Sequence, residues 1–355
     1  MILLQLLPSA ISLFRKQDAN QHLVKSSLLA NICVDSCVDS QFQVNPERLW
    51  GYLTELPPNR FSELDRQATR QYLTQTLQSA GWSVRRQEFT LQSNNRSYHG
   101  VNIIAEQPQL SVQHDDRRSI NRPRGDSERS ASSTLIIGAH YDSVENSPGA
   151  DDNGTGVAAT LELAQLLRPQ FTNHHNSADS NRLAQTNLSI KLVFFDLEES
   201  GLWGSKAFVD DTKERQDIAA AVILEMLGYA CHTEGCQTYP PLPIEPPSQI
   251  GDFLAVVGDR NHPDLVNRFQ SSTSIPVYTL TIPTLGPLTP DLLRSDHVPF
   301  WRKGIGAVMV TDTANFRNPH YHRASDRPNT LDLDFFTAAT QIVVDALILQ
   351  NVALN

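Results

Sequence analysis

The stretch Thr134-Leu-Ile-Ile-Gly-Ala-His-Tyr-Asp-Ser143 joins an apolar run to two polar side chains that follow it directly. A short aliphatic run that ends at a glycine predicts a buried strand. His140 and Asp142 then alternate along an extended segment, so they share one side of the chain. The loop 148–154 follows and contains Asp151 and Asp152. Because burying such polar groups is costly, their clustering indicates a cation or a reaction that uses them.

Apolar strands alternate with helices along most of the chain. Helical spacing predicts helices over residues 46–53, 62–80, 156–167, 204–210, 250–260, 263–271 and 333–349. Strands are expected over residues 82–89, 98–105, 134–137, 188–195, 219–224, 276–280 and 305–311. Buried strands separated by helices predict an α/β fold, with a mixed, mainly parallel central sheet sandwiched between helices.

The chain of 355 residues, 40% of them hydrophobic, is long enough for one large domain. We expect this domain to span residues 45–355, with polar insertions near 113–133 and 172–187, and residues 1–44 to be peripheral. Residues 1–14 are apolar, but they are too short for a membrane span, and their basic residues follow the run instead of preceding it. No signal peptide is evident, and both a cytoplasmic and an exported protein remain compatible with the sequence.

The net charge of −10, from 29 Lys and Arg against 39 Asp and Glu, argues against nucleic acid or an anionic membrane as a partner. The four cysteines do not have zinc-finger spacing. Two interpretations of Cys231 and Cys236 stay open: two free thiols, or a disulfide-closed loop that would require an oxidising compartment.

Further acidic and histidine residues follow other predicted strands. Glu198 and Glu199 follow residues 188–195, Glu225 follows 219–224, and His322 comes after 305–311. The carboxyl ends of parallel strands meet at one sheet edge, which predicts a shared site. One of the adjacent glutamates could bind a metal while the other takes a proton from water. Either Asp151 or Asp152 could bridge two cations.

Two motifs near the C-terminus leave alternatives open. Ser295 is expected to cap a helix that begins near Asp296 and His297. His320 and His322 alternate with Tyr321, so spacing alone does not choose between them as ligands.

Taken together, the motifs resemble those of the family-28 metallopeptidases, co-catalytic zinc aminopeptidases whose relatives include glutaminyl cyclases. The motifs are His140-Tyr-Asp142-Ser, Pro148-Gly-Ala-Asp151-Asp152-Asn-Gly, Glu198-Glu199-Ser-Gly-Leu-x-Gly-Ser, Glu225-Met-x-Gly-Tyr229, Ser295-Asp296-His297 and Tyr321-His322-x-x-x-Asp326. A glutamate at Glu225, where the best-known members often have aspartate, resembles a bacterial branch with a Glu-Met-x-Gly-Tyr motif. The resemblance implies the zinc-dependent exopeptidase (phosphorylase/hydrolase-like) architecture.

The resemblance also implies roles for single residues. His140 and Glu225 would bind one zinc ion, Glu199 and His322 a second, and Asp151 would bridge the two. Glu198 would be the general base and Asp142 would support His140, while the peptide bond between Asp151 and Asp152 would be cis. Three further residues are expected near the ligands or the substrate: Asp152, Tyr229 and Asp296.

The activity implied is hydrolysis of a peptide with a free N-terminus, by an aminopeptidase with two zinc ions. One alternative is a glutaminyl cyclase-type acyltransferase on the same fold, and another is a non-catalytic binding module. A carboxypeptidase has less support, because no arginine for a C-terminal carboxylate stands on a matching motif. The oligomeric state, the preferred N-terminal residue and the native metal are not determined by the sequence.

Overall fold

The computed structural model describes residues 14–16, 42–93, 95–108, 133–168, 188–240, 246–269, 275–283 and 290–349. Most of the expected insertions, 113–132 and 172–187, and most of the peripheral segment 1–44 lie outside the described residues. Within them, no helix is both long enough and apolar enough to cross a bilayer.

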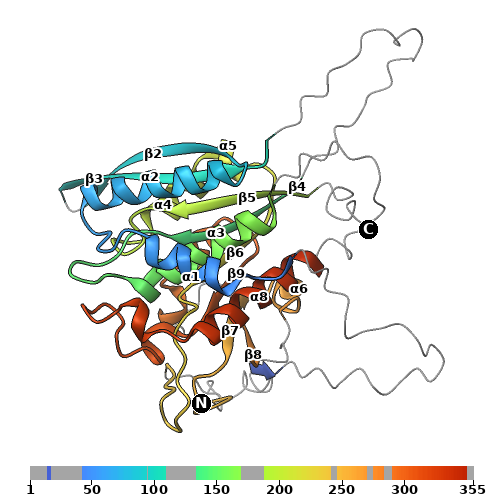
Figure 1. Cartoon of the computed structure of the whole chain (residues 1–355). Helices are drawn as coiled ribbons and strands as arrows, with labels where there is room; N and C mark the ends of the chain where they lie inside the picture. The colour runs from blue at the N-terminus through green and yellow to red at the C-terminus, as the bar shows by residue number, and fades with distance from the viewer. Residues whose placement is uncertain are drawn as a thin grey trace, which may run out of the picture.

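The described residues form a nine-stranded mixed sheet in the order β1-β8-β7-β9-β6-β4-β5-β3-β2 (Figure 1). The strands are β1 (Phe14–Lys16), β2 (Ser83–Ser93), β3 (Arg96–Glu106), β4 (Ser133–His140), β5 (Leu188–Phe195), β6 (Ile218–Glu225), β7 (Leu254–Asp259), β8 (Val277–Ile282) and β9 (Ala307–Thr311). The central strands β5, β4, β6 and β9 are parallel to one another, while β3 and β7 run antiparallel to their central neighbours. This arrangement confirms the expected fold class.

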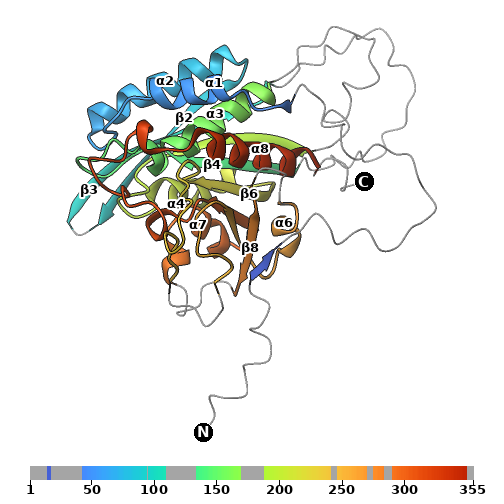
Figure 2. The same ribbon diagram turned by 60° about the horizontal axis from the view of Figure 1, so that its bottom comes forward.

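Helices cover both faces of the sheet (Figure 2). The helices are α1 (Pro46–Glu55), α2 (Glu63–Ser79), α3 (Gly156–Leu166), α4 (Trp203–Asp210), α5 (Thr212–Arg215), α6 (Pro263–Val266), α7 (His297–Arg302) and α8 (Leu333–Leu349). Shorter irregular or 3-10 turns are η2 (Ala150–Thr155), η3 (Pro290–Leu293), η4 (Ala314–Phe316) and η5 (Pro328–Thr330). Helices α1, α2, α3 and α8 share one apolar core with the sheet, and α4 and α7 share the other.

The two helix starts expected near the N-terminal end of the domain are confirmed. The Asn45 side chain accepts the backbone N–H of Arg48 at 2.8 Å, and the Ser62 hydroxyl accepts that of Asp65 at 3.2 Å. Each cap satisfies a donor that has no partner within its helix.

Three local predictions are wrong. Residues 250–260 contain strand β7 instead of a helix, because both faces of Leu254–Asp259 are buried and a continuous apolar run does not distinguish the two structures. The helix expected over 263–271 is limited to α6. Ser295 does not cap a helix: α7 begins at His297, and the Ser295 hydroxyl instead donates to Glu225 Oε2 at 2.6 Å.

The disulfide that the sequence left open is present between Cys231 and Cys236. The loop that it closes is attached to the domain through reciprocal backbone hydrogen bonds between Cys231 and Gly251. The residues directly after it, Gln237 to Pro240, contribute to the wall of the cavity described below.

Candidate metal centre

The four parallel central strands end at one edge of the sheet, and each delivers a polar residue there. The last residue of β4 is His140 and the last residue of β6 is Glu225. Glu198 and Glu199 follow β5, and His322 lies on the segment after β9. Pairing of His140 with Phe195 and of Glu225 with Thr311 aligns these strand ends. The convergence expected from the sequence is therefore present.

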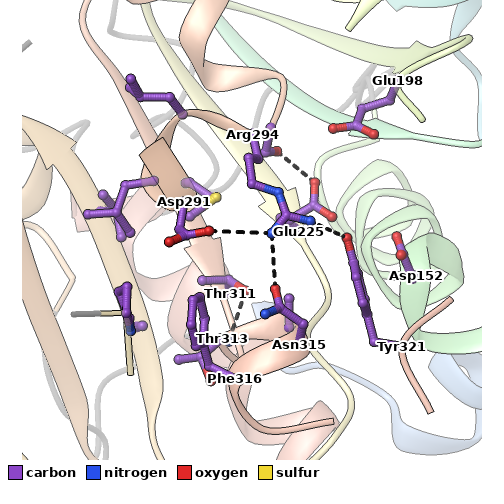
Figure 3. Close-up of a pocket in the computed structure, with 18 of the residues that line it drawn as sticks. Asp152, Glu198, Glu225, Asp291, Arg294, Thr311, Thr313, Asn315, Phe316 and Tyr321 are labelled. Carbon is purple, nitrogen blue, oxygen red and sulfur yellow. Dashed lines mark hydrogen bonds and ion pairs between the residues drawn. The ribbon is translucent and has the colours of Figure 1, made fainter. Parts of the chain in front are cut away.

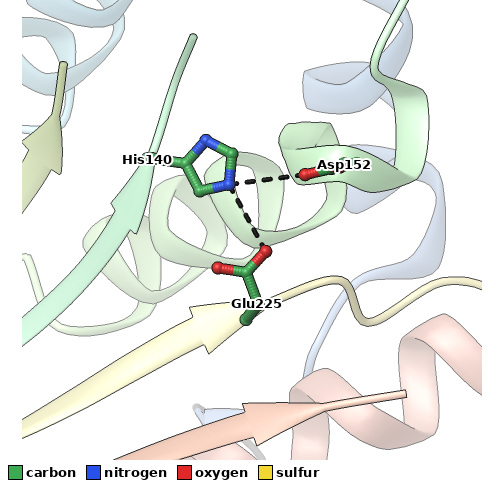
Figure 4. A group of neighbouring side chains, drawn as sticks. All are labelled: His140, Asp152 and Glu225. Carbon is green, nitrogen blue, oxygen red and sulfur yellow. Dashed lines mark hydrogen bonds and ion pairs between the residues drawn. The ribbon is translucent and has the colours of Figure 1, made fainter. Parts of the chain in front are cut away.

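The first ligand group consists of His140, Asp152 and Glu225 (Figure 4). His140 Nε2 lies 3.4 Å from Asp152 Oδ1 and 3.3 Å from Glu225 Oε1. Atoms that bind one tetrahedral zinc at about 2.0–2.2 Å are roughly 3.3–3.6 Å apart. The three atoms thus have the spacing of ligands around one ion.

The second ligand group consists of Asp152, Glu199 and His322. His322 Nε2 lies 3.1 Å from Asp152 Oδ2 and 3.1 Å from Glu199 Oε2. The first group is largely buried, whereas the imidazole side chain of His322 is 34% exposed. The second group is therefore the more accessible from solvent.

Asp152 belongs to both groups, and it uses a different oxygen in each. This position was expected for Asp151, so the sequence-based assignment of the two aspartates is corrected. Asp151 Oδ1 instead accepts the backbone N–H of Gly228 at 3.0 Å, and Asp151 Oδ2 accepts Asn318 Nδ2 at 2.7 Å. The cis peptide bond likewise lies one residue later than expected, between Asp152 and Asn153.

Asp142 lies beside the first group, as the sequence predicts. Its backbone oxygen is 3.2 Å from His140 Nδ1 and its carboxylate is 3.5 Å from the same atom. A partner at Nδ1 sets the tautomer and leaves Nε2 free to bind a metal. Both Asp142 carboxylate oxygens also accept backbone N–H groups, from Glu198 at 3.0 Å and Glu199 at 3.2 Å.

Asp326 performs a similar function for the turn that carries Asp152. Its two carboxylate oxygens accept the backbone N–H groups of Asp151 at 2.9 Å and Asp152 at 3.1 Å. Arg60 is fully buried and donates to the backbone oxygens of Tyr141 and Gly149, which joins the two loops. The sequence contains no signal for this role of Arg60, because a single arginine in a loop has no periodic context.

The electrostatics of the site favour positive charge. Burial opposes charge on His322, yet hydrogen bonds with Asp152 and Glu199 raise the pKa of its imidazole to about 10. Burial raises the pKa of Glu199 to about 7. Burial would also raise that of Asp152, but hydrogen bonds with His140 and His322 hold its pKa below the usual range.

Among the described residues, the buried Glu199 Oε1 has no hydrogen-bond partner, and Asp152 Oδ2 has only its 3.1 Å contact with His322 Nε2. Neutral imidazoles and ionised carboxylates are among the groups that bind zinc in proteins. Carboxylate oxygens with few hydrogen-bond partners, set among other ligand atoms, fit a divalent cation. The cation would take the place of the protons that these groups otherwise bind.

Glu198 is buried, and its carboxylate belongs to neither ligand group. Burial raises the pKa of its carboxyl well above the usual range; His140 opposes this shift, and the nearby carboxylates of Glu225 and Asp296 add to it. Asp296 is likewise buried and accepts a hydrogen bond from the Ser205 hydroxyl. Its Oδ2 has no partner among the described residues, and burial raises its pKa to about 7.

A cavity of about 450 Å³ opens onto these groups (Figure 3). Asp152, Glu198, Glu199 and His322 line one part of it. Its apolar wall includes Leu202, Val257, Leu280, Leu292 and Met309. Tyr229, expected near the substrate, is not among the described residues that line the cavity, and its backbone N–H donates to Asp312 Oδ2 at 2.9 Å. His320 contacts Ser325 and belongs to neither ligand group.

Solved structures with this fold include two enzymes of different kinds. The aminopeptidase from Aneurinibacillus sp. strain AM-1 superposes with a TM-score of 0.58 at 16% identity, covering 86% of this chain and 94% of that one. The glutaminyl cyclase of Porphyromonas gingivalis superposes with a TM-score of 0.56 at 18% identity, covering 86% and 99%. At these identities the similarity establishes the fold alone.

The chain also resembles known proteins in sequence. The uncharacterized protein YfbL of Escherichia coli K12 is 33% identical over 214 residues, covering 56% of this chain and 61% of the relative. Leucine aminopeptidase 1 of Uncinocarpus reesii is 28% identical over 176 residues, covering 45% and 39%. The aligned region therefore spans less than two thirds of either relative. The sequence model of peptidase family M28 matches residues 122–347, which is more than half of the chain, and so this chain belongs to peptidase family M28.

Proposed function

We propose that this chain is a zinc-dependent aminopeptidase that binds two metal ions and hydrolyses peptide bonds at free N-termini. One observation carries the proposal: the two oxygens of Asp152 face separate groups of ligand atoms. A carboxylate shared in this way is what a pair of adjacent cations requires. Membership of family M28 supports a peptidase, and the name of the leucine aminopeptidase relatives supports the N-terminal mode of cleavage.

Each ligand group would hold one ion. His140 and Glu225 would bind the first, Glu199 and His322 the second, and Asp152 would bridge both. When bound, zinc ions lower the pKa of water and polarise a carbonyl group. Asp142 would keep His140 Nε2 directed at the first ion through its contacts with Nδ1.

Glu198 would act as the general base. Its carboxylate lines the cavity next to both groups but is not required as a ligand. It would accept a proton from the attacking water and deliver it to the amine that leaves. The hydrogen bond from its backbone N–H to Asp142 fixes the segment that carries it.

The cavity matches a peptide whose first residue is apolar. Its acidic end attracts an α-ammonium group, and its wall of leucine, valine and methionine side chains would bury an aliphatic side chain. This complementarity supports a free N-terminus and an apolar N-terminal residue.

A glutaminyl cyclase is the second candidate, favoured by the similarity in fold to the Porphyromonas gingivalis enzyme. The two reactions give different products from a peptide that begins with glutamine. Cyclisation releases ammonia, so the peptide keeps its length and its mass falls by that of ammonia. Hydrolysis instead releases free glutamine. Since a complete second ligand group is present, we expect hydrolysis.

The decisive experiment measures metal content and product together. The purified protein is reconstituted with zinc, its zinc content is determined by elemental analysis, and leucine p-nitroanilide and a glutamine-initiated peptide are offered. Two zinc ions per chain and release of the free amino acid support the proposal. Ammonia release without hydrolysis would support a cyclase, and zinc-loaded protein without either product would support a non-catalytic binding module.

A further inference from the structure

Arg294 lies in the cavity, close to the metal ligands. It follows η3 and precedes α7, and its side chain is 48% exposed. Figure 3 shows its guanidinium in front of Glu225 and beside Tyr321. Five of the described residues that line the cavity are acidic: four belong to the ligand groups or lie next to them (Asp152, Glu198, Glu199 and Glu225), and the fifth is Asp291. Two zinc ions would account for the acidic residues at the ligand groups. They do not account for an arginine beside those residues.

The guanidinium of Arg294 is only partly engaged. Nη2 donates to the Tyr321 hydroxyl at 3.0 Å and Nη1 donates to Asn315 Oδ1 at 3.4 Å, while Asp291 lies 3.7 Å away. Two of these contacts are long, and two are with neutral groups. Since a guanidinium carries five N–H donors, several remain for a ligand.

The second cation of the cavity, Lys206, is engaged differently. Its ammonium donates to the Gly201 backbone oxygen at 2.6 Å and lies 4.3 Å from the ring of Trp203. Burial lowers its pKa. Lys206 thus has local partners, and Arg294 is the better placed of the two to bind an anion.

One aromatic ring separates Arg294 from the second ligand group. The Tyr321 ring stacks on the His322 imidazole, with centroids 3.8 Å apart, and the Tyr321 hydroxyl accepts from Arg294. Each extended residue of a peptide spans about 3.5 Å. A peptide whose scissile carbonyl lies at the ligand groups can therefore place a group one residue away near Arg294.

We propose that Arg294 binds a carboxylate of the peptide substrate and thereby selects substrates that carry one within about one residue of the scissile bond; this rests on the proposed function. The guanidinium of an arginine can bind a carboxylate through two parallel hydrogen bonds. Two sources present the same chemistry: the α-carboxylate of a dipeptide, which agrees with the apolar first residue proposed above, and the side chain of an acidic first residue, which would replace that preference.

The test compares matched substrates on the zinc-loaded protein. Leu-Ala is compared with its amide, Leu-Ala-NH2, for the α-carboxylate, and Glu-Ala-NH2 with Gln-Ala-NH2 for the side chain. The wild-type protein should show kcat/KM about 10- to 100-fold higher for the acid of one pair, the effect of a charge-assisted hydrogen bond. The pair that shows the difference identifies the source of the carboxylate.

Arg294→Gln should remove this discrimination. The control is Arg302→Gln, which deletes an exposed cation at the end of α7 that does not line the cavity and should leave the ratio unchanged. Two results would overturn the proposal: no acid–amide preference in either pair, or a loss in Arg294→Gln that is equal for acid and amide. The second result would make Arg294 a positioning residue for Tyr321.

A binding measurement separates failure of this inference from failure of the proposed function. Absence of hydrolysis by the zinc-loaded wild type would refute the aminopeptidase. Calorimetric titration of that protein with the same four peptides would still report on Arg294. Tighter binding of one acid, lost in Arg294→Gln, supports the carboxylate site, and equal binding of acids and amides overturns it. Should Arg294→Gln fail to fold, Arg294→Lys replaces it: loss of the two parallel donors should lower the acid–amide ratio, and an unchanged ratio overturns the proposal.

Discussion

The carboxylate of Asp142 accepts the backbone N–H of Glu198 at 3.0 Å. The other oxygen of the same carboxylate accepts the N–H of Glu199, and the Asp142 backbone oxygen contacts His140 Nδ1. Asp142 therefore fixes three residues through its carboxylate and its backbone oxygen: a ligand of each group and the proposed general base. It connects the end of β4 with the loop after β5.

We expect Asp142→Asn to weaken zinc binding by about 10- to 100-fold, the usual effect of losing a partner that orients ligands. The amide can accept through one oxygen only, and its NH2 group would face a backbone N–H. Competition with a chelator of known affinity measures the change. Asp264→Asn, on an exposed residue of α6, is the control and should bind zinc as the wild type does. Unchanged zinc affinity in Asp142→Asn would contradict this role.

The assignment of Asp152 and Asp151 can be tested with a matched pair of substitutions. Asp152→Ala should lose both zinc ions, because it removes a ligand from each group. Asp151→Ala should retain two ions but lower the free energy of unfolding by about 1–3 kcal/mol, because it leaves Gly228 N–H and Asn318 Nδ2 without their acceptor. Elemental analysis and urea unfolding measure the two effects. The reverse pattern would restore Asp151 as the bridging residue.

Glu198→Gln should retain the full zinc content and lose activity. The glutamine has nearly the same shape but cannot accept a proton, and general bases contribute about 10²- to 10⁴-fold to the rate. We expect kcat for leucine p-nitroanilide to fall by that factor while zinc stoichiometry is unchanged. Glu145→Gln, on an exposed residue of the loop after β4, should have wild-type activity. A fully active Glu198→Gln protein would show that another group accepts the proton.

The sequence predicts where the site lies, but it does not predict which aspartate is shared between the two ligand groups. His140, Glu199 and Glu225 each come at or just after the end of an apolar strand. Because these strands pair in parallel, their ends lie at the same edge of the sheet, independently of the loop conformations. The family-level resemblance is confirmed by the match to family M28. The choice between Asp151 and Asp152 depends on the backbone dihedrals of η2, which composition does not encode.

Other features depend on contacts between distant segments. Strand β7 is as apolar as a buried helix, so periodicity could not identify it. Ser295 has the composition of a helix cap, but its hydroxyl is close enough to Glu225 to donate to it instead. Arg294 carries no local signal, because its proposed role depends on a cavity whose lining residues come from separate segments between Asp152 and His322.

His297 provides a pH test that does not involve the metal ligands. It is fully buried at the start of α7, with Nε2 donating to the Leu292 backbone oxygen at 3.0 Å and Nδ1 unpartnered among the described residues. Burial lowers its pKa from 6.5 to about 4. Between these values the unfolded chain binds the proton and the folded protein does not, so stability falls as the pH falls from 6.5 towards 4. From pH 7 to pH 5 the wild type should lose about 2 kcal/mol more than His297→Gln or His297→Phe, as measured by urea unfolding in chelator. Parallel pH profiles for the wild type and both variants would mean that this imidazole does not resist protonation in the folded protein.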